Sequence, residues 1–299
     1  MKLAVIGSIN MDQVVTTERI PGKGETLAGS DLRYISGGKG ANQAVAMARL
    51  GAEVSMFGCV GDDDNGRQLL DALRKEGVDV SHVAVREEAP TGLAIITVSE
   101  NDNVIIVVSG ANGLVDRAYI DSIADQLMDC DLVVLQHEIP IDTVHYAVSF
   151  CYEKGIPAVL NPAPAAKVPE EIIEKVSLLT PNEHEAALIF GEDMGMDEML
   201  KSHPEKLIIT CGSKGACFCT KDGETITVPA IEAGVVDTTG AGDTLNGAIC
   251  VRIAAGDDLE AALRYANVAA GLSVEKFGAQ GGMPTDRDVA NRMAELDEE

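Results

Sequence analysis

Short apolar runs separated by helical patterns are the feature that most constrains the fold of this chain. The runs LAVIGS, EVSMFGCV, DLVVLQ, PAVLN, VSLLT and KLIITCG lie at 3–8, 53–60, 131–136, 157–161, 176–180 and 206–212. Strands that are apolar throughout are typical of a parallel sheet buried on both faces. Apolar residues recur at helical spacing in 120–127 and 144–151, and 41–50 is small and apolar almost all round. The sequence therefore predicts a three-layer α/β/α core with a mainly parallel sheet.

Two stretches break this alternation of strands and helices. Extended segments at 12–20 and 28–36 flank the turn-rich PGKGE, and TGLAIITVS and NVIIVVS flank a polar turn at 100–102. Pairs of strands with no helix between them favour a small antiparallel sheet. Such a sheet cannot bury two faces by itself, so we expect it to cover something as a lid. The predicted domains are a catalytic core of 1–11, 37–90 and 110–299 and a β lid of 12–36 and 91–109.

The charge balance excludes some classes of partner. The 299 residues include 48 acidic and 23 basic side chains, a formal net charge of −25, while 46% of the residues are hydrophobic. Nucleic acids and anionic membranes are bound by clustered Lys and Arg, so neither is expected as a partner. A phosphorylated substrate would have to be held by local devices.

The N-terminal segment and the cysteines predict a cytoplasmic protein. The apolar run in MKLAVIGSINMD is too short for a signal peptide, and no later stretch approaches the ~20 apolar residues of a membrane span. The seven cysteines are odd in number and spread along the chain, which is typical of reduced core residues. Cys217 and Cys219 have no second ligand pair nearby, so a zinc site is not expected.

The most informative motif is a glycine-rich turn followed by an apolar helix, DTTGAGDTLNG at 237–247. Gly240 and Gly242 leave backbone N–H groups free to converge, and the helix that follows directs its positive dipole end to the same place. These features favour a site for phosphate charge. Asp243, in the first turn of the helix, could accept a proton from a substrate hydroxyl. The same residues also fit an ordinary N-terminal cap after a glycine turn.

A second glycine-rich stretch, SGGKGANQ at 36–43, precedes the buried helix. Its glycines allow a ligand to approach the backbone, and Lys39 and Asn42 supply donors for hydroxyl groups. Asn10 and Asp12 follow the first strand, at the carboxyl edge where open α/β sheets bind ligands. A tight turn with a solvated lysine and a capping aspartate are the alternatives. Lys39 lacks the following Ser or Thr of a Walker A loop, so nucleotide would need another device.

An ordered series of motifs along nearly the whole chain resembles the ribokinase family of carbohydrate kinases. The motifs are GSINMD at 7–12, GGKGANQA at 37–44, GDD at 61–63, GAN at 110–112, NPAPA at 161–165, TPNEHEA at 180–186, GSKG at 212–215, DTTGAGDTLNG at 237–247 and FGAQ at 277–280. The resemblance implies a ribokinase-like fold and ATP-dependent phosphorylation of the primary O5 hydroxyl of D-ribose. Fructose, 2-keto-3-deoxygluconate or adenosine as substrate, and an idle sugar-binding protein on the same fold, are the alternatives.

The resemblance also assigns the sugar site and the catalytic base. The sugar would lie between the lid and the core, against Asn10, Asp12, Gly38, Lys39, Asn42 and Glu138. Asp243 matches the catalytic base, and the N–H groups of Gly240, Ala241, Gly242 and Asp243 would hold the γ-phosphoryl group. His137 stands where the family more often has an apolar residue, and we expect it to be a packed histidine. The chain has five Phe, five Tyr and no Trp, which offers little for a pocket that would bind the base of adenosine.

ATP, Mg²⁺ and K⁺ are implied by the same resemblance. Residues matching the ATP site are Asn182, Thr210, Gly212, Ser213, Gly215, Gly242 and Asn267. Asn182 and Glu185 form an N-x-x-E element that would organise Mg²⁺ through water. Residues matching the K⁺ site are Asp237 and Thr239 on one loop and Ser273, Lys276, Gly278 and Gly282 on another. Lids in this family often pair between subunits, so the resemblance also predicts a homodimer formed through the lid.

Overall fold

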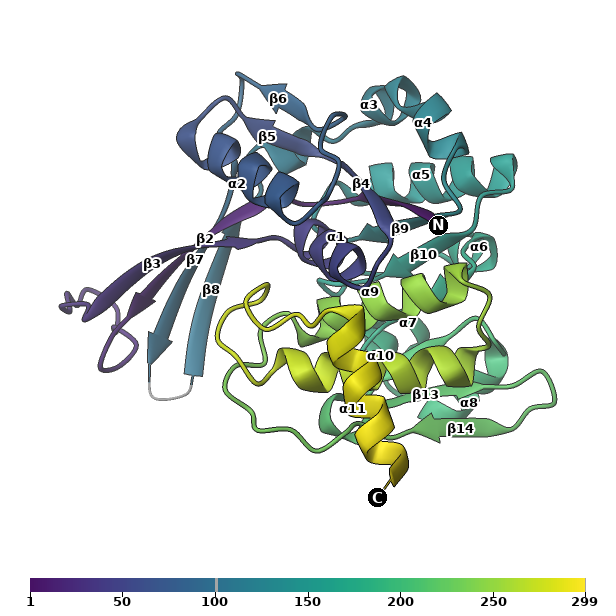
Figure 1. The fold of residues 1–299 in the computed structure, drawn as a ribbon. Helices are drawn as coiled ribbons and strands as arrows, with labels where there is room; N and C mark the ends of the chain where they lie inside the picture. The colour runs from purple at the N-terminus through teal and green to yellow at the C-terminus, as the bar shows by residue number, and fades with distance from the viewer. Residues whose placement is uncertain (100–101, 299) are drawn as a thin grey trace.

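A five-stranded parallel sheet forms the centre of the computed structural model, which describes residues 1–99 and 102–298 (Figure 1). The strand order is β11-β10-β9-β1-β4. The strands are β1 (Lys2–Ile6), β4 (Glu53–Phe57), β9 (Leu132–Gln136), β10 (Ala158–Asn161) and β11 (Leu178–Leu179). Every residue of β9 and β10 is buried, as expected for strands covered on both faces.

Alternate side chains of the sheet enter two separate hydrophobic cores. Leu3 and Val5 of β1 pack with one set of helices, whereas Ala4 and Ile6 pack with the other. The first layer contains α1 (Lys39–Arg49), α2 (Asp64–Lys75), α9 (Ala241–Ala254), α10 (Leu259–Ser273) and α11 (Asp286–Glu298). The second contains α3 (Arg117–Ser122), α4 (Ala124–Met128), α5 (Ile141–Lys154), α6 (Glu170–Lys175), α7 (Glu183–Phe190) and α8 (Met196–Ser202). The predicted α/β/α core is confirmed.

Three segments differ in detail from the sequence-based expectation. The run at 53–60 is divided by Gly58, so that β4 ends at Phe57 and β5 (Cys59–Gly61) pairs instead with β6 (Ala84–Arg86). The helical pattern at 120–127 forms two helices, α3 and α4, because the backbone leaves the helical region at Ile123 (φ −108°). The run at 206–212 forms β12 (Ile208–Thr210), which joins an antiparallel sheet with β13 (Ala216–Cys219) and β14 (Thr225–Val228).

A separate four-stranded sheet extends from the body of the molecule (Figure 1). Its order is β3-β2-β7-β8, from β2 (Asn10–Thr16), β3 (Asp31–Gly37), β7 (Gly92–Ser99) and β8 (Asp102–Val108). Each hairpin is antiparallel, and the two are joined by parallel pairing of β2 with β7. Residues 100 and 101 of the predicted turn lie outside the described residues. The extended segments are therefore present in one small sheet, while the domain boundaries drawn from the sequence stay a prediction.

In the part of the chain that the structure describes, no helix combines the length and the apolar character needed to span a bilayer.

Candidate active site

The glycine-rich turn at 237–247 ends at the N-terminus of α9. Gly240 is the N-cap in the left-handed region (φ 80°), and a Cβ there would come within 2.7 Å of the Ala279 carbonyl oxygen. Glycine is therefore needed both for the backbone conformation and for the space. The Ala241 N–H donates to the Thr238 carbonyl at 3.2 Å. First-turn N–H groups have no intrahelical acceptor, so those of Gly242 and Asp243 lie at the open end of the helix, where an anion is favoured.

Asp243 is held by two side-chain amides from α1. The carboxylate is only 6% exposed. Its Oδ2 accepts a hydrogen bond from Asn42 Nδ2 at 2.9 Å, and its Oδ1 accepts one from Gln43 Nε2 at 3.1 Å. Both donors are neutral, so they orient the carboxylate without pairing its charge with a cation. Gln43 was not singled out from the sequence, because nothing in its local context indicates a partner 200 residues away.

The predicted sugar-site residues Lys39 and Glu138 meet at the start of α1. Glu138 Oε2 accepts from Ser8 Oγ at 2.6 Å and from the Lys39 backbone N–H at 2.9 Å. Burial alone would lower the pKa of the Lys39 ammonium, but the carboxylates of Asp243, Glu138 and Glu185 outweigh it and raise that pKa. The lysine is therefore protonated at neutral pH and provides positive charge inside the site.

Asp12 lies on β2, half-buried, and faces the same group of carboxylates. Burial, followed by the negative charges of Glu138 and Asp243, raises the pKa of Asp12 to about 7. Its side chain packs against Gly37 of the paired strand β3. Such a carboxyl is poised to change its protonation state close to neutral pH, which makes it sensitive to a ligand that donates hydrogen bonds.

Asn10, Gly38 and His137 complete this end of the sheet. Asn10 is buried, and its Oδ1 accepts from Asn112 Nδ2 at 2.7 Å. Gly38, the N-cap of α1, lies directly against the Asn10 backbone. His137 is a packed histidine with Nδ1 at 3.3 Å from the Pro164 carbonyl oxygen, and burial lowers its pKa to about 4.

A cavity of about 690 Å³ borders the N-terminus of α9, where Ala241 and Gly242 line it. Its lining includes residues predicted to contact ATP, namely Thr210, Gly212, Ser213, Gly215, Gly242 and Asn267. Asn182 is not part of the lining but pairs with Thr210 through a parallel β-bridge. The Asn267 Nδ2 group donates to the carbonyls of Val228 and Pro229 at 2.9 and 3.1 Å. These hydrogen bonds fix the start of the loop that lines the cavity from Ala230 onward. Further lining residues that no sequence motif marked are 230–233 and Val235 of the preceding loop, Ala270 and Gly271 of α10, and Val274 just after α10.

The N-x-x-E element forms a capping box at the start of α7. Asn182 Oδ1 accepts from the Glu185 N–H at 2.8 Å, and Glu185 Oε2 accepts from the Asn182 N–H at 2.9 Å. Burial raises the pKa of the Glu185 carboxyl. The negative charge of this carboxylate in turn helps to raise the pKa of Lys39. The cap uses Oε2, and Oε1 can still accept from water. The donor set thus fits Mg²⁺ held through water, the coordination this ion commonly keeps.

The two loops predicted to bind K⁺ are joined by Asp237. Its Oδ1 accepts from the Thr239 N–H at 2.9 Å and its Oδ2 from the Gly278 N–H at 2.9 Å. Burial would raise the pKa of Asp237, but these backbone hydrogen bonds outweigh it and lower that pKa. Gly282 packs against the Ser273 carbonyl, with no room for a Cβ, and Lys276 and Thr239 are exposed. An ionised carboxylate beside backbone carbonyls fits a large, weakly hydrated cation.

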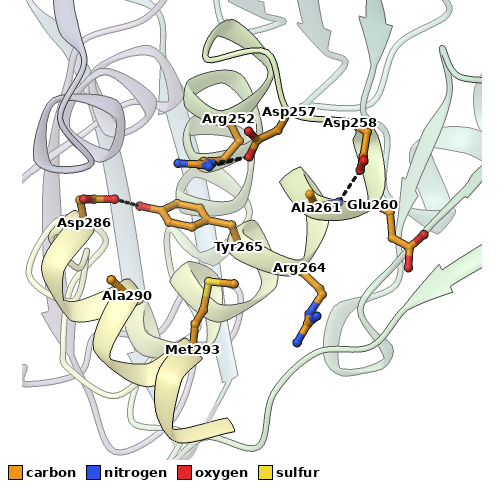
Figure 2. A pocket seen from close by; sticks show the side chains of 10 residues that line it. All are labelled: Arg252, Asp257, Asp258, Glu260, Ala261, Arg264, Tyr265, Asp286, Ala290 and Met293. Atoms are coloured by element: carbon orange, nitrogen blue, oxygen red, sulfur yellow. Dashed lines mark hydrogen bonds and ion pairs between the residues drawn. The ribbon is translucent and has the colours of Figure 1, made fainter. Parts of the chain in front are cut away.

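A different hollow lies between the end of α9, the start of α10 and α11 (Figure 2). Its charged walls pair with one another: Arg252 contacts Asp257 at 2.6 Å, and the Tyr265 hydroxyl donates to Asp286 at 2.7 Å. Arg252 also stacks over the Tyr265 ring. These contacts join the helices, and no residue predicted for the active site lines this hollow.

Comparison with known proteins identifies the family. Residues 1–286 match the family described as pfkB family carbohydrate kinase. The chain belongs to the pfkB family. It is therefore a sugar kinase that uses ATP.

The most similar pfkB relatives found include two bacterial ribokinases. That of Bacillus subtilis (strain 168) is 46% identical over 292 residues, covering 98% of this chain and 99% of the relative. That of Lactococcus lactis subsp. lactis (strain IL1403) is 45% identical over 298 residues, covering 99% and 98%. Among solved structures, Arabidopsis thaliana ribokinase complexed with ribose and ATP has a TM-score of 0.87 at 31% identity, with 97% of each chain covered.

Proposed function

We propose that this protein transfers the γ-phosphoryl group of ATP to the O5 hydroxyl of D-ribose, giving D-ribose 5-phosphate and ADP. The observation that carries the proposal is the position of Asp243. This buried carboxylate lies in the first turn of α9, directly after Gly242, which lines a cavity of about 690 Å³, and its charge acts on Lys39. The ribokinases at 46% and 45% identity support ribose as the sugar.

The transfer needs a base, an anion site and alignment of the two substrates. Asp243 takes the proton of the O5 hydroxyl as the bond from O5 to the γ-phosphorus forms and the bond from that phosphorus to the ADP oxygen breaks. The N–H groups of residues 240–243, at the N-terminus of α9, stabilise the charge on the moving phosphoryl group. The Ala241 N–H is released from the Thr238 carbonyl when it binds the phosphoryl oxygen. Catalysis of this kind rests on positioning and charge stabilisation.

The sugar is recognised by hydrogen bonds. Asp12 and Glu138 accept from ribose hydroxyls, and Lys39, Asn42 and Asn10 donate to them, with Gly38 giving the sugar access to the backbone. A sugar that lacks one of these hydroxyls binds with a less favourable free energy, because a partly buried carboxylate oxygen is then left without a hydrogen-bond donor. This favours ribose over 2-deoxyribose.

Mg²⁺ and K⁺ are part of the proposal. Asn182 and Glu185 would hold Mg²⁺ through water beside the ATP phosphates. Asp237, Thr239 and backbone oxygens of Ser273, Lys276, Gly278 and Gly282 would hold K⁺ beside the turn that precedes α9. Both ions supply positive charge that an acidic chain otherwise lacks near the phosphates.

We also propose that the four-stranded sheet is a lid, comprising 12–36 and 91–109, and that two lids pair in a homodimer. On β8, all five residues from Val104 to Val108 are apolar and between 45% and 58% exposed. Alternate residues of a strand face opposite sides, so both faces of β8 are exposed over 104–108. One face can close over the sugar, and the other face and the edge can pack against a second copy.

A substrate comparison tests the proposed function. ADP formation would be measured with D-ribose, 2-deoxy-D-ribose, D-fructose, 2-keto-3-deoxygluconate and adenosine, with K⁺ present and with K⁺ replaced by tetramethylammonium. We expect D-ribose to have the highest kcat/KM, the rate to depend on K⁺, and ³¹P NMR to identify a 5-phosphate. An equal or higher kcat/KM for another acceptor would contradict ribose as the substrate, and no ADP formation with any acceptor would contradict the kinase.

A further inference from the structure

We propose that Gln43 is a positioning residue that holds the Asp243 carboxylate in the orientation needed to accept a proton, and that Gln136 fixes the Gln43 side chain. The inference rests on the proposed function in taking Asp243 as the base. Neither glutamine is expected to touch the sugar or ATP, and both act through the carboxylate.

Every polar atom of the Gln43 side chain has a defined partner. Gln43 is fully buried. Its Nε2 donates to Asp243 Oδ1 and to Asn161 Oδ1, both at 3.1 Å, and its Oε1 accepts from Gln136 Nε2 at 2.7 Å. A carboxylate can only accept hydrogen bonds, so the NH₂ group of Gln43 must face Asp243. The partner on the carbonyl side, Gln136, prevents the amide from turning over.

The amide is anchored to the central sheet. Gln136 and Asn161 are the last residues of the neighbouring strands β9 and β10, and they are paired in register. Asn161 Nδ2 donates in turn to the Thr180 carbonyl at 3.1 Å. The position of Gln43 is thus set by the ends of two paired, buried strands, and through Gln43 this support reaches Asp243.

A close approach of two helices lets Gln43 reach the base. Gly247 lies one turn after Asp243 on α9, and a Cβ there would come within 2.8 Å of the Ala46 Cβ and 3.2 Å of the Gln43 carbonyl oxygen. The absence of a side chain at this position brings α1 and α9 together. The Gln43 side chain can then span the remaining distance to Asp243.

The same sheet edge also holds the turn that precedes the base. Thr180 Oγ1 donates to Asn246 Oδ1 at 2.5 Å, and Asn246 Nδ2 donates to the Gly242 carbonyl at 2.9 Å. Hydrogen bonds therefore connect the ends of β9 and β10 to the base through Gln43 and to the anion-binding turn through Asn246. Both parts of the catalytic machinery share one support.

The charges around Asp243 explain why a donor is needed there. Asp12 on β2 and Glu138 after β9 are carboxylates, Lys39 on α1 is the nearby cation, and Glu185 on α7 acts on that lysine. Adjacent negative charges favour uptake of a proton, whereas hydrogen bonds donated to a carboxylate favour its ionised form. Without the Gln43 donor, Asp243 Oδ1 would lose the hydrogen bond that fixes its orientation.

The test compares three network variants with a matched glutamine outside the network. Gln43→Met removes the hydrogen bonds at similar volume, and Gln43→Glu keeps the shape but faces Asp243 with a second carboxylate. Gln136→Met removes the donor that holds the Gln43 carbonyl. The number of buried acceptors without a partner stays the same, because the unpaired Gln136 Oε1 is lost as Gln43 Oε1 becomes unpaired; Gln136 Oε1 has no hydrogen-bond partner within the described residues. Gln126→Met on α4 is the control. Gln126 is half-buried, its Oε1, like that of Gln136, is buried without a hydrogen-bond partner among the described residues, and it lies in the opposite helix layer.

Steady-state kcat and the KM values for sugar and ATP would be measured from pH 5.5 to 9, together with Tm. We expect kcat of Gln43→Met to fall about 10- to 100-fold while both KM values change less than about threefold. The acid limb of the kcat profile should move up by about one pH unit in Gln43→Glu. Gln136→Met should lose less kcat at unchanged Tm, and Gln126→Met should match the wild type. Asp12 also titrates in this range, so the readout is the shift from the wild-type profile.

The inference would be overturned if both Gln43 variants kept the wild-type kcat and the wild-type pH profile of kcat. It would also be overturned if kcat fell only in proportion to Tm and fell equally in Gln126→Met. If Gln43→Met does not fold, Gln43→Glu and Gln136→Met decide by the same criteria. Asp243→Asn distinguishes the role of Asp243 as the base from the role of Gln43 and Gln136 in positioning it. Retained kcat in that variant would refute the base itself, whereas its loss together with normal Gln43 and Gln136 variants would refute only the positioning network.

Discussion

Asp12→Asn should change stability in a way that depends on pH. Burial and the charges of Glu138 and Asp243 raise the pKa of Asp12 from the ordinary value of 3.8 to about 7 in the folded protein. Between these two values the native state holds the proton and the unfolded chain does not. The free energy of unfolding of the wild type therefore falls as the pH rises from 3.8 to about 7, and asparagine removes this dependence.

The size of the effect follows from the shift. Each pH unit in this window costs the native state about 1.4 kcal/mol. From pH 5 to pH 8 the carboxyl passes through about two such units, so the stability of Asp12→Asn relative to the wild type should increase by about 3 kcal/mol. The variant should also bind sugar more weakly, because the site loses an acceptor for ribose hydroxyls. The Asp12 carboxylate thus lowers the stability of the wild type near neutral pH but contributes to sugar binding.

Urea unfolding at pH 5, 6, 7 and 8, followed by far-UV circular dichroism, measures this difference. The chain has no Trp, so intrinsic fluorescence would be a poor probe. Taking the variant minus the wild type at each pH cancels all groups that titrate equally in both. A difference that stays flat from pH 5 to pH 8 would refute the argument that Asp12 is forced into a cluster of carboxylates.

Three further predictions concern the loops, the cap and the lid. Arg49→Met removes hydrogen bonds to the carbonyls of Gln280 and Met283, at 2.6 and 2.9 Å. This variant should lower the free energy of unfolding by about 2–3 kcal/mol, and it should raise the K⁺ concentration needed for half-maximal activity. An unchanged K⁺ titration would exclude this tie to the cation loop. Asn182→Ala should cost about 1 kcal/mol in urea unfolding and raise the Mg²⁺ requirement, and a Mg²⁺ titration equal to that of the wild type would leave it as a cap alone. Ile106→Lys on β8 should give a monomer by light scattering with an unchanged circular dichroism spectrum, while a persistent dimer would argue against pairing through the lid.

The strands of the core and the ends of two helices could be predicted from the sequence because their signals are local. A continuous apolar run such as 131–136 indicates a doubly covered strand, and the glycines around Asp243 indicate a helix start. Asn182 and Glu185 also carry a local signal, since their spacing is that of a capping box as well as of a ligand pair.

Other features depend on contacts between distant parts of the chain. Gln43 meets Asn161 across 118 residues and Asp243 across 200, and an amide in a glycine-rich motif gives no sign of either partner. The run at 206–212 has the apolar character of a core strand, but the short turn that follows returns β13 alongside it as an antiparallel partner. Nothing in the composition of the loop from Ala230 to Val235 marks it as a wall of the cavity beside α9.

The central claim is that Asp243 is the base for phosphoryl transfer to a sugar bound beside it. Asp243→Asn keeps the shape of the side chain but cannot take the hydroxyl proton. The most direct measurement is single-turnover transfer from [γ-³²P]ATP to D-ribose, with binding of both substrates measured separately by calorimetry. The account predicts a transfer rate lower by about 10²–10⁴-fold with dissociation constants within about threefold of the wild type. A transfer rate close to that of the wild type would contradict it.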